Sequence, residues 1–133
     1  MDMTPEFIVL AFTLILALVQ IGAAGIARTA ELGATWNVGP RDEAVPPPGK
    51  LAGRLMRAQA NLFETLPIFA AAVIMAHIAG KDGTALTFVG THLYFFGRLI
   101  YVPLYAFGVP YIRSLVWLAA AAGLVMVLVA LFL

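Results

Sequence analysis

The segment Arg57-Ala58-Gln59-Ala60-Asn61-Leu62-Phe63-Glu64 stands where a long hydrophobic run begins. It places a cation, an amide and a carboxylate at positions i, i+4 and i+7, which a helix presents on one face over about 10 Å of its axis. A charged side chain inside a bilayer is costly and usually meets a partner, water or a ligand. The stripe formed by Arg57, Asn61 and Glu64 is therefore a candidate functional site.

The composition around this stripe is that of a membrane protein. Of the 133 residues, 62% are hydrophobic and 11% are charged, against roughly 45–50% and 25% in a soluble domain. Four apolar stretches approach or exceed the ~20 residues that span a bilayer core. We predict a single all-α domain over residues 1–133, an integral membrane, left-handed, antiparallel four-helix bundle with short turns after the second and third helices. Its expected helices are at about 5–27, 51–79, 84–107 and 112–133, with a cytoplasmic loop at 28–50.

Basic residues indicate the orientation of this bundle. Six of them lie in or near the long loop or the turn after the third helix: Arg28, Arg41, Lys50, Arg54, Arg57 and Arg113. Lys81 is alone on the opposite side, so positive-inside counting places both termini outside the cytoplasm. The start of the first helix lacks basic residues, and we expect that helix to be a membrane span and not a removable signal, with Pro5 in its first turn and Thr4 or Asp2 as its cap. A net charge of +1 gives no indication of a nucleic-acid partner.

The long loop contains Pro46-Pro47-Pro48-Gly49, and proline runs stiffen a connection. Two alternatives stay open: an ordered strap over the mouth of the bundle, or a simple tether. Trp36 and Trp117 are expected to be anchors at the membrane interface.

The chain has no cysteine, so it has no thiol nucleophile or disulfide of its own. Only two histidines are present, His77 and His92, and we expect no acid near either one in sequence. Neither a metal site nor thiol chemistry by the protein itself is therefore predicted.

A second polar stripe lies in the third helix. Tyr94, Arg98, Tyr101 and Tyr105 fall at i, i+4, i+7 and i+11 and share one face. Because the second and third helices run in opposite directions, the two stripes are expected to face one another in the same half of the membrane. Arg98 lies too deep to reach water, so Glu64 is its natural partner.

Two interpretations of these stripes remain open. In the structural one, Glu64 and Arg98 form an intramembrane ion pair, Asn61 bridges helices, and the tyrosines form an interfacial belt. In the functional one, the donors outnumber what one carboxylate satisfies, and an anionic ligand occupies the space between them. The donors are Arg57, Gln59, Asn61, Arg98, Arg113 and two tyrosines.

The pattern Arg57-Ala58-Gln59-x-Asn61-x-x-Glu64-x-x-Pro67-x-Phe69, followed by Gly97-Arg98-x-x-Tyr101-x-x-x-Tyr105, resembles the MAPEG family of membrane proteins in eicosanoid and glutathione metabolism, here in a bacterial-type form. The resemblance covers the whole chain and implies homotrimers that hold glutathione, as co-substrate, between subunits near the cytoplasmic face. It implies that Arg57, Gln59, Asn61, Glu64, Tyr101 and Tyr105 bind glutathione. Arg113 is the nearest match to the arginine that stabilises the glutathione thiolate, and Arg98 matches a buried arginine, so these two are the catalytic candidates.

Three functions follow as hypotheses. The first is a membrane-bound, glutathione-dependent transferase or peroxidase that acts on hydrophobic electrophiles or lipid hydroperoxides, in the cytoplasmic membrane if the protein is bacterial. The second is a non-catalytic trimer that binds lipid or a protein partner. The third is a small multidrug exporter, which is disfavoured because such a transporter typically carries its working carboxylate in the first helix, where we find only Gln20 as a polar candidate.

Overall fold

The computed structural model describes residues 2–133, which form five helices and no strand. They are α1 (Pro5–Leu32), α2 (Ala34–Val38), α3 (Lys50–Ile78), α4 (Ala85–Ala106) and α5 (Ile112–Ala130). All except α2 are long and apolar enough to cross a membrane. The predicted all-α, four-helix membrane fold is therefore confirmed, and the protein is a multi-pass integral membrane protein. The trimer and the hand of the bundle stay predictions.

Local sequence signals set where the helices begin. The Thr4 hydroxyl caps α1 by accepting from the Phe7 amide at 3.2 Å, and Pro5 occupies the first turn, as expected. Thr84 caps α4 in the same way, accepting from the Thr87 amide at 3.2 Å. Both caps satisfy backbone donors that the first helical turn leaves unpaired.

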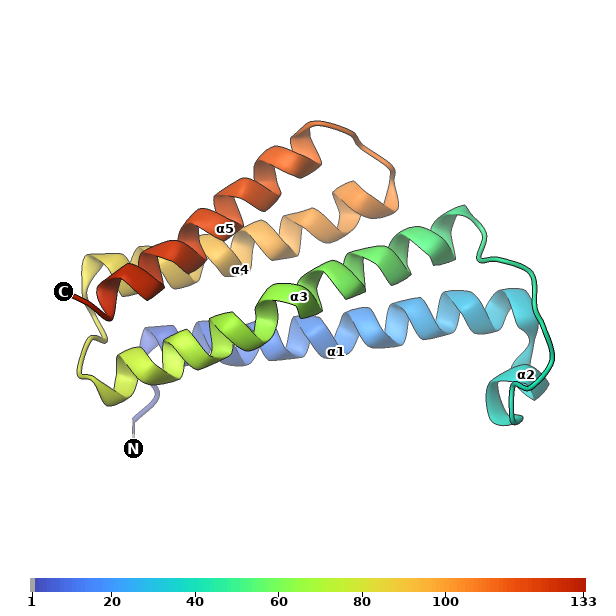
Figure 1. The fold of residues 1–133 in the computed structure, drawn as a ribbon, viewed down its shortest axis with the longest axis horizontal. Helices are drawn as coiled ribbons and strands as arrows, with labels where there is room; N and C mark the ends of the chain where they lie inside the picture. Colours follow the sequence, from blue (N-terminus) through green and yellow to red (C-terminus); the bar gives the residue numbers. More distant parts are fainter. Residues whose placement is uncertain (1) are drawn as a thin grey trace.

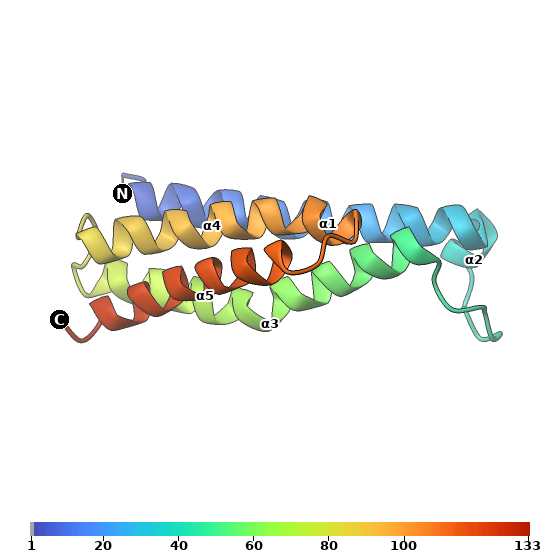
Figure 2. The same ribbon diagram turned by 90° about the horizontal axis from the view of Figure 1, so that it is seen from above.

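The helices pair as two antiparallel hairpins, α1 with α3 and α4 with α5 (Figure 1). In residues 2–133, α3 and α4 also touch across the centre of the bundle, whereas α1 and α5 do not contact each other. Both termini lie at one end, together with the turn between α3 and α4 (Figure 2). We call this end the terminal end, and the opposite end, which carries α2 and the turn between α4 and α5, the loop end.

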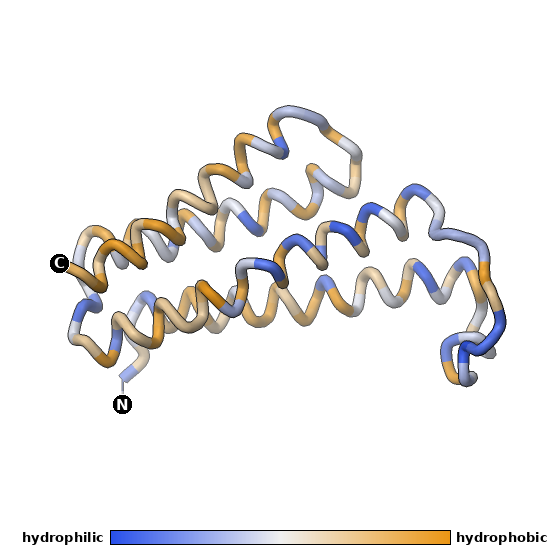
Figure 3. Tube along the Cα trace, in the orientation of Figure 1, coloured by the Kyte–Doolittle hydropathy of each residue, from blue (hydrophilic) through white to orange (hydrophobic). Residues whose placement is uncertain are grey.

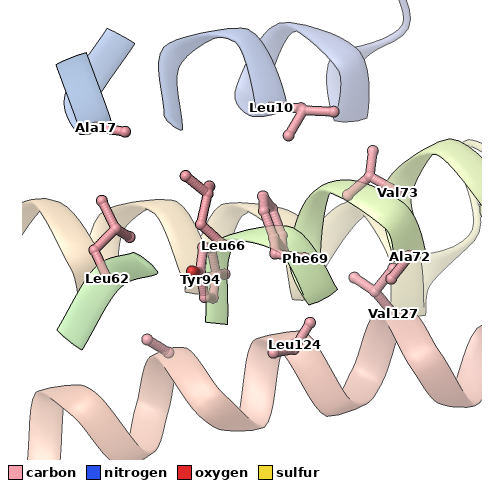
Figure 4. Packing of buried hydrophobic residues seen from close by; sticks show 11 residues of the cluster. Leu10, Ala17, Leu62, Leu66, Phe69, Ala72, Val73, Tyr94, Leu124 and Val127 are labelled. Atoms are coloured by element: carbon pink, nitrogen blue, oxygen red, sulfur yellow. The ribbon is translucent and has the colours of Figure 1, made fainter. Parts of the chain in front are cut away.

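The two hairpins come closer together toward the terminal end (Figure 1), and buried hydrophobic side chains of α1, α3, α4 and α5 pack between them to form the core (Figure 4). The rings of Phe69 and Tyr94 stack there with centroids 4.0 Å apart, joining α3 to α4. On the other side of α4, Gly90 and Gly123 let α5 approach so closely that a Cβ built on Gly90 would lie 2.7 Å from the Gly123 carbonyl oxygen. Close packing of small residues holds membrane helices together where the lipid supplies no hydrophobic driving force between them.

The loop predicted over residues 28–50 begins too early. α1 continues to Leu32, because Arg28 and Glu31 pair across one turn at 2.9 Å, and it stops at Gly33, whose φ of +93° favours glycine. The extended segment that follows α2 is tied back by Arg28 to the Pro46 carbonyl and by Glu31 to the Gly49 amide. It is thus an ordered strap at the ends of α1 and α3, but it does not cover the mouth of the bundle, since it lies apart from α4 and α5 (Figure 1).

Candidate functional site

Hydrophilic residues concentrate in the half of α3 nearer the loop end, whereas the other half of this helix is mainly hydrophobic (Figure 3). Some of these residues lie close enough to α4 and α5 to form contacts with their side chains. Six of the eight residues predicted for the site form one connected group in the structure, joined by hydrogen bonds and cation–ring contacts. They are Arg57, Asn61, Arg98, Tyr101, Tyr105 and Arg113.

Asn61 is the centre of this group. Its Oδ1 accepts from Nη1 of Arg98 at 2.8 Å and from Nε1 of Trp117 at 2.9 Å, so one amide oxygen links α3, α4 and α5. The Arg98 guanidinium also lies over the Tyr101 ring, 4.5 Å from its centroid. Asn61, Arg98, Tyr101 and Trp117 are referred to below as the Asn61 cluster.

Tyr105 extends the group toward the loop end. Its ring packs edge-on against Tyr101, with centroids 5.6 Å apart, and its hydroxyl accepts from Nε of Arg57 at 3.1 Å. The Arg113 guanidinium lies over the same ring, 4.5 Å from the centroid. Tyr105 therefore contacts two cations, one from α3 and one from α5.

A pocket opens between α3, α4 and α5 beside these residues. Its volume is about 340 Å³, and it is lined by Asn61, Tyr101, Arg113, Ser114, Trp117 and Leu118. This size falls within the roughly 300–1,000 Å³ of small-molecule sites. Its charged lining residue, Arg113, is a cation, so the pocket suits a ligand with an anionic or hydrogen-bond-accepting group.

The predicted ion pair between Glu64 and Arg98 is wrong. Arg98 is 1% exposed and bonds to Asn61, whereas Glu64 is exposed and forms no ion pair in residues 2–133. Glu64 lies seven residues from Arg57, so the two share one face of α3, and both are exposed enough for a ligand to reach them. Gln59 is half-buried, and its side chain forms no hydrogen bond to the group within residues 2–133.

Sequence reasoning missed Trp117. We expected an interface anchor, but its indole is half-buried and donates to Asn61. The signal was present in the spacing: Trp117 follows Arg113 by four residues, so the two share a face of α5. Several buried polar atoms lack a hydrogen-bond partner in the described part of the chain: Nε and Nη2 of Arg98, both amide atoms of Gln20, Oε2 of Glu6 and Oδ1 of Asp82.

A second polar cluster, also missed, lies at the terminal end. Glu6 is 1% exposed, and its Oε1 accepts from the Gly83 amide at 2.7 Å and from the Thr87 hydroxyl at 3.0 Å. Glu6, Gly83 and Thr87 are referred to below as the Glu6 cluster. The first helix therefore does carry a buried carboxylate, contrary to our reading of Gln20 as its sole polar candidate. This carboxylate joins the start of α1 to the beginning of α4.

The expectation that no acid lies near either histidine is also wrong. Asp82 follows His77 by five residues, and the turn after α3 brings its Oδ2 into a hydrogen bond with Nδ1 of His77. The His77 ring also packs against Phe7 of α1, with centroids 4.2 Å apart. His77 thus has a packing and hydrogen-bonding role between α1 and the turn.

Fold and site define a class of protein: a multi-pass four-helix membrane protein with a cationic pocket between its helices. Within this class, the chain belongs to the MAPEG family, whose profile matches residues 7–133. That family includes glutathione transferases and peroxidases. A comparison with curated proteins finds no match.

Proposed function

We propose that this protein is a membrane-bound, glutathione-dependent transferase or peroxidase that acts on hydrophobic electrophiles or lipid hydroperoxides. The observation that carries the proposal is the surplus of donors in the Asn61 cluster and around Tyr105. Arg98 is buried with two of its three nitrogens unpartnered, and Arg113 lines the adjacent pocket. A buried cation is costly unless it is paired, so an anionic ligand stabilises this arrangement.

Glutathione has the groups that this surface can bind. It carries two carboxylates and one ammonium group, and arginines bind carboxylates through charge-assisted hydrogen bonds. We assign the carboxylates to Arg57 and its neighbours Asn61, Tyr101 and Tyr105, and the ammonium to Glu64, with Gln59 as an additional contact. Arg57 and Glu64 are both exposed on one face of α3, and Arg57 also bonds to Tyr105, which supports a ligand that reaches both α3 and α4.

Arg113 is the better candidate for the thiolate-stabilising residue, because it lines the pocket, whereas Arg98 is bonded to Asn61 behind it. A thiol with a pKa near 8.5 is mostly protonated at neutral pH, and a guanidinium beside the sulfur favours the anion. Arg98 then positions Asn61 and contributes its charge from behind the pocket.

The reaction requires no nucleophile from the protein. In conjugation, the thiol proton passes to water, the sulfur forms a bond to the electrophilic carbon, and the leaving group departs with its electron pair. In the peroxidase reaction, two glutathione molecules are oxidised to the disulfide, while the hydroperoxide is reduced to an alcohol and water. The hydrophobic electrophile or lipid hydroperoxide reaches the site from the bilayer, along the apolar outer surfaces of the helices.

The site fits an assembly in which a second subunit covers α3. Most of each spanning helix is unburied within the protomer, at 22–39% buried for the most apolar window of each helix. Arg57 and Glu64 are exposed among these apolar surfaces, where charged groups need partners. A homotrimer with glutathione between subunits would cover part of these apolar surfaces and give Arg57 and Glu64 partners. In this assembly the loop end lies in the cytoplasm and both termini lie outside it.

A glutathione titration by calorimetry on detergent-solubilised protein tests the proposal, together with conjugation of glutathione to chlorodinitrobenzene. Arg57→Ala should weaken glutathione binding by about 10-fold or more, since a hydrogen bond to a charged group contributes about 1.5–3 kcal/mol. Arg41→Ala is the matched control, because Arg41 contacts Asn37 and Trp36 far from the pocket. Absence of both binding and conjugation would overturn the proposal, and lipid that co-purifies in their absence would favour the non-catalytic alternative.

A further inference from the structure

We propose that Trp117 is a positioning residue: together with Arg98 it fixes the Asn61 side chain so that the amide nitrogen donates to the ligand. The pocket then takes a carboxylate or carbonyl group of the ligand at Asn61. This inference rests on the proposed function, which it deepens by naming the ligand group and the residue that selects it.

The chemistry of the two partners fixes the orientation of the amide. The guanidinium of Arg98 and the indole of Trp117 are donors without acceptor capacity. The atom of Asn61 that lies between them, 2.8 Å and 2.9 Å away, must therefore be the oxygen. Asparagine amides are often ambiguous between two flipped states, and two converging donors remove that ambiguity here.

The amide nitrogen is consequently the group that Asn61 offers to the pocket. Asn61 lines the pocket, its Nδ2 is not among the buried unpartnered atoms, and no acceptor from residues 2–133 binds it. The other polar groups that line the pocket can also donate hydrogen bonds to a ligand. Arg113 donates only, whereas the hydroxyls of Tyr101 and Ser114 can donate or accept.

Trp117 is needed because one donor alone does not hold the plane of an amide. A single hydrogen bond from Arg98 leaves the Asn61 side chain free to rotate about that bond. The second bond, from a different helix, fixes the plane and hence the direction of the N–H groups. Pre-organised donors bind a ligand better because they lose less freedom when it arrives.

Indole exchange by NMR tests the hydrogen bond directly in the full-length protein in detergent. The chain has two tryptophans, Trp36 and Trp117, so ¹⁵N-indole labelling gives two signals, which Trp36→Phe and Trp117→Phe assign. We expect the Trp117 indole N–H to exchange slowly with solvent, and Asn61→Ala to accelerate its exchange. If the Trp117 indole N–H exchanges as fast as that of Trp36, or does not respond to Asn61→Ala, the proposed hydrogen bond from Trp117 to Asn61 is overturned.

Glutathione titrations of three variants test the ligand part. Trp117→Phe keeps the ring but removes the donor, and it should raise the Kd about 5- to 10-fold, as expected for one lost hydrogen bond. Trp36→Phe, the matched control in α2, should leave the Kd unchanged. Asn61→Asp keeps an oxygen for Arg98 and Trp117 but replaces the donor, so it should raise the Kd more than 10-fold while the Trp117 indole stays protected.

Wild-type affinity in Asn61→Asp would overturn the donor role of Asn61. Wild-type affinity in Trp117→Phe would overturn the positioning role of Trp117. If the wild-type protein itself binds no glutathione, the proposed function fails and the ligand part fails with it. The indole exchange measurement still decides whether the hydrogen bond exists, so the two failures are distinguishable.

Discussion

The Asn61 cluster and the Glu6 cluster each contain a buried charged residue, Arg98 and Glu6, yet unpartnered donors lie at one cluster and unpartnered acceptors at the other. Around Asn61 the unpartnered atoms are donors, the Nε and Nη2 of Arg98. Around Glu6 they are acceptors, the Oε2 of Glu6 and the Oδ1 of neighbouring Asp82. A pocket opens beside the first cluster, between helices that share one amide oxygen.

This difference separates a binding role from a structural one. The Glu6 carboxylate joins the start of α1 to the turn before α4, through the backbone of Gly83 and the hydroxyl of Thr87. The Asn61 cluster instead holds a donor-rich wall that suits an anion. Substitutions at the Glu6 cluster should lower the free energy of unfolding without changing glutathione binding or turnover. Substitutions around the pocket should change binding or turnover and leave the free energy of unfolding nearly unchanged.

The largest effect is expected at Arg113. Arg113→Ala should lower kcat for chlorodinitrobenzene conjugation about 100-fold. This is the lower end of the roughly 100- to 1,000-fold decrease that follows the loss of one group that stabilises developing charge. Removing the cation raises the pKa of the bound glutathione thiol, so the alkaline rise of the pH–rate profile should move to higher pH. The thermal unfolding temperature should stay close to that of the wild type. An unchanged pH profile would exclude Arg113 as the thiolate-stabilising residue.

The next largest effect is expected at Glu6. Glu6→Ala should lower the free energy of unfolding in detergent by about 2 kcal/mol, because it removes the acceptor of two hydrogen bonds, from the Gly83 amide and the Thr87 hydroxyl. Glu6→Gln keeps an oxygen that can accept from Gly83 and Thr87, so it is the matched control and should cost clearly less. Glutathione affinity should be unchanged in both variants. Equal losses of stability in the two variants would show that the charge of Glu6, and not its hydrogen bonds, matters.

The smallest effect is expected at Thr65, whose hydroxyl lies 2.7 Å from that of Tyr94 in the core between α3 and α4. Thr65→Val should lower the free energy of unfolding by about 0.6 kcal/mol, the average for a hydrogen bond between membrane helices. Equilibrium unfolding in mixed detergent measures this value. A loss of stability as large as that of Glu6→Ala would contradict the ranking of Glu6 above Thr65.

Much of the fold could be predicted from the sequence. Hydropathy located four spans, and the spacing of Arg98, Tyr101 and Tyr105 placed them on one face of α4, where the structure has them. These features follow from short-range rules: the length of an apolar run and the periodicity of a helix. The short helix α2 escaped prediction because it lies in a polar segment with no apolar periodicity.

The partners of the polar side chains could not be predicted in the same way. The sequence predicted that Arg98 would pair with Glu64 of the facing helix, but in the structure Arg98 bonds to Asn61 and Glu64 is exposed. Which polar group Arg98 reaches depends on how α4 packs against its neighbours, through the stacked Phe69 and Tyr94 rings and the close approach of α5 at Gly90. No local pattern encodes these contacts.

The sequence by itself determined that this is a membrane protein with four spanning helices and two polar stripes, because hydropathy and helical periodicity act along the chain. Only the tertiary structure decided that Asn61 joins Arg98 to Trp117, that Tyr105 contacts both Arg57 and Arg113, and that Glu6 is buried at the opposite end. The physical reason is that a hydrogen bond forms only between groups within about 3 Å of each other. Which groups come that close is set by the packing of helices that are distant in sequence.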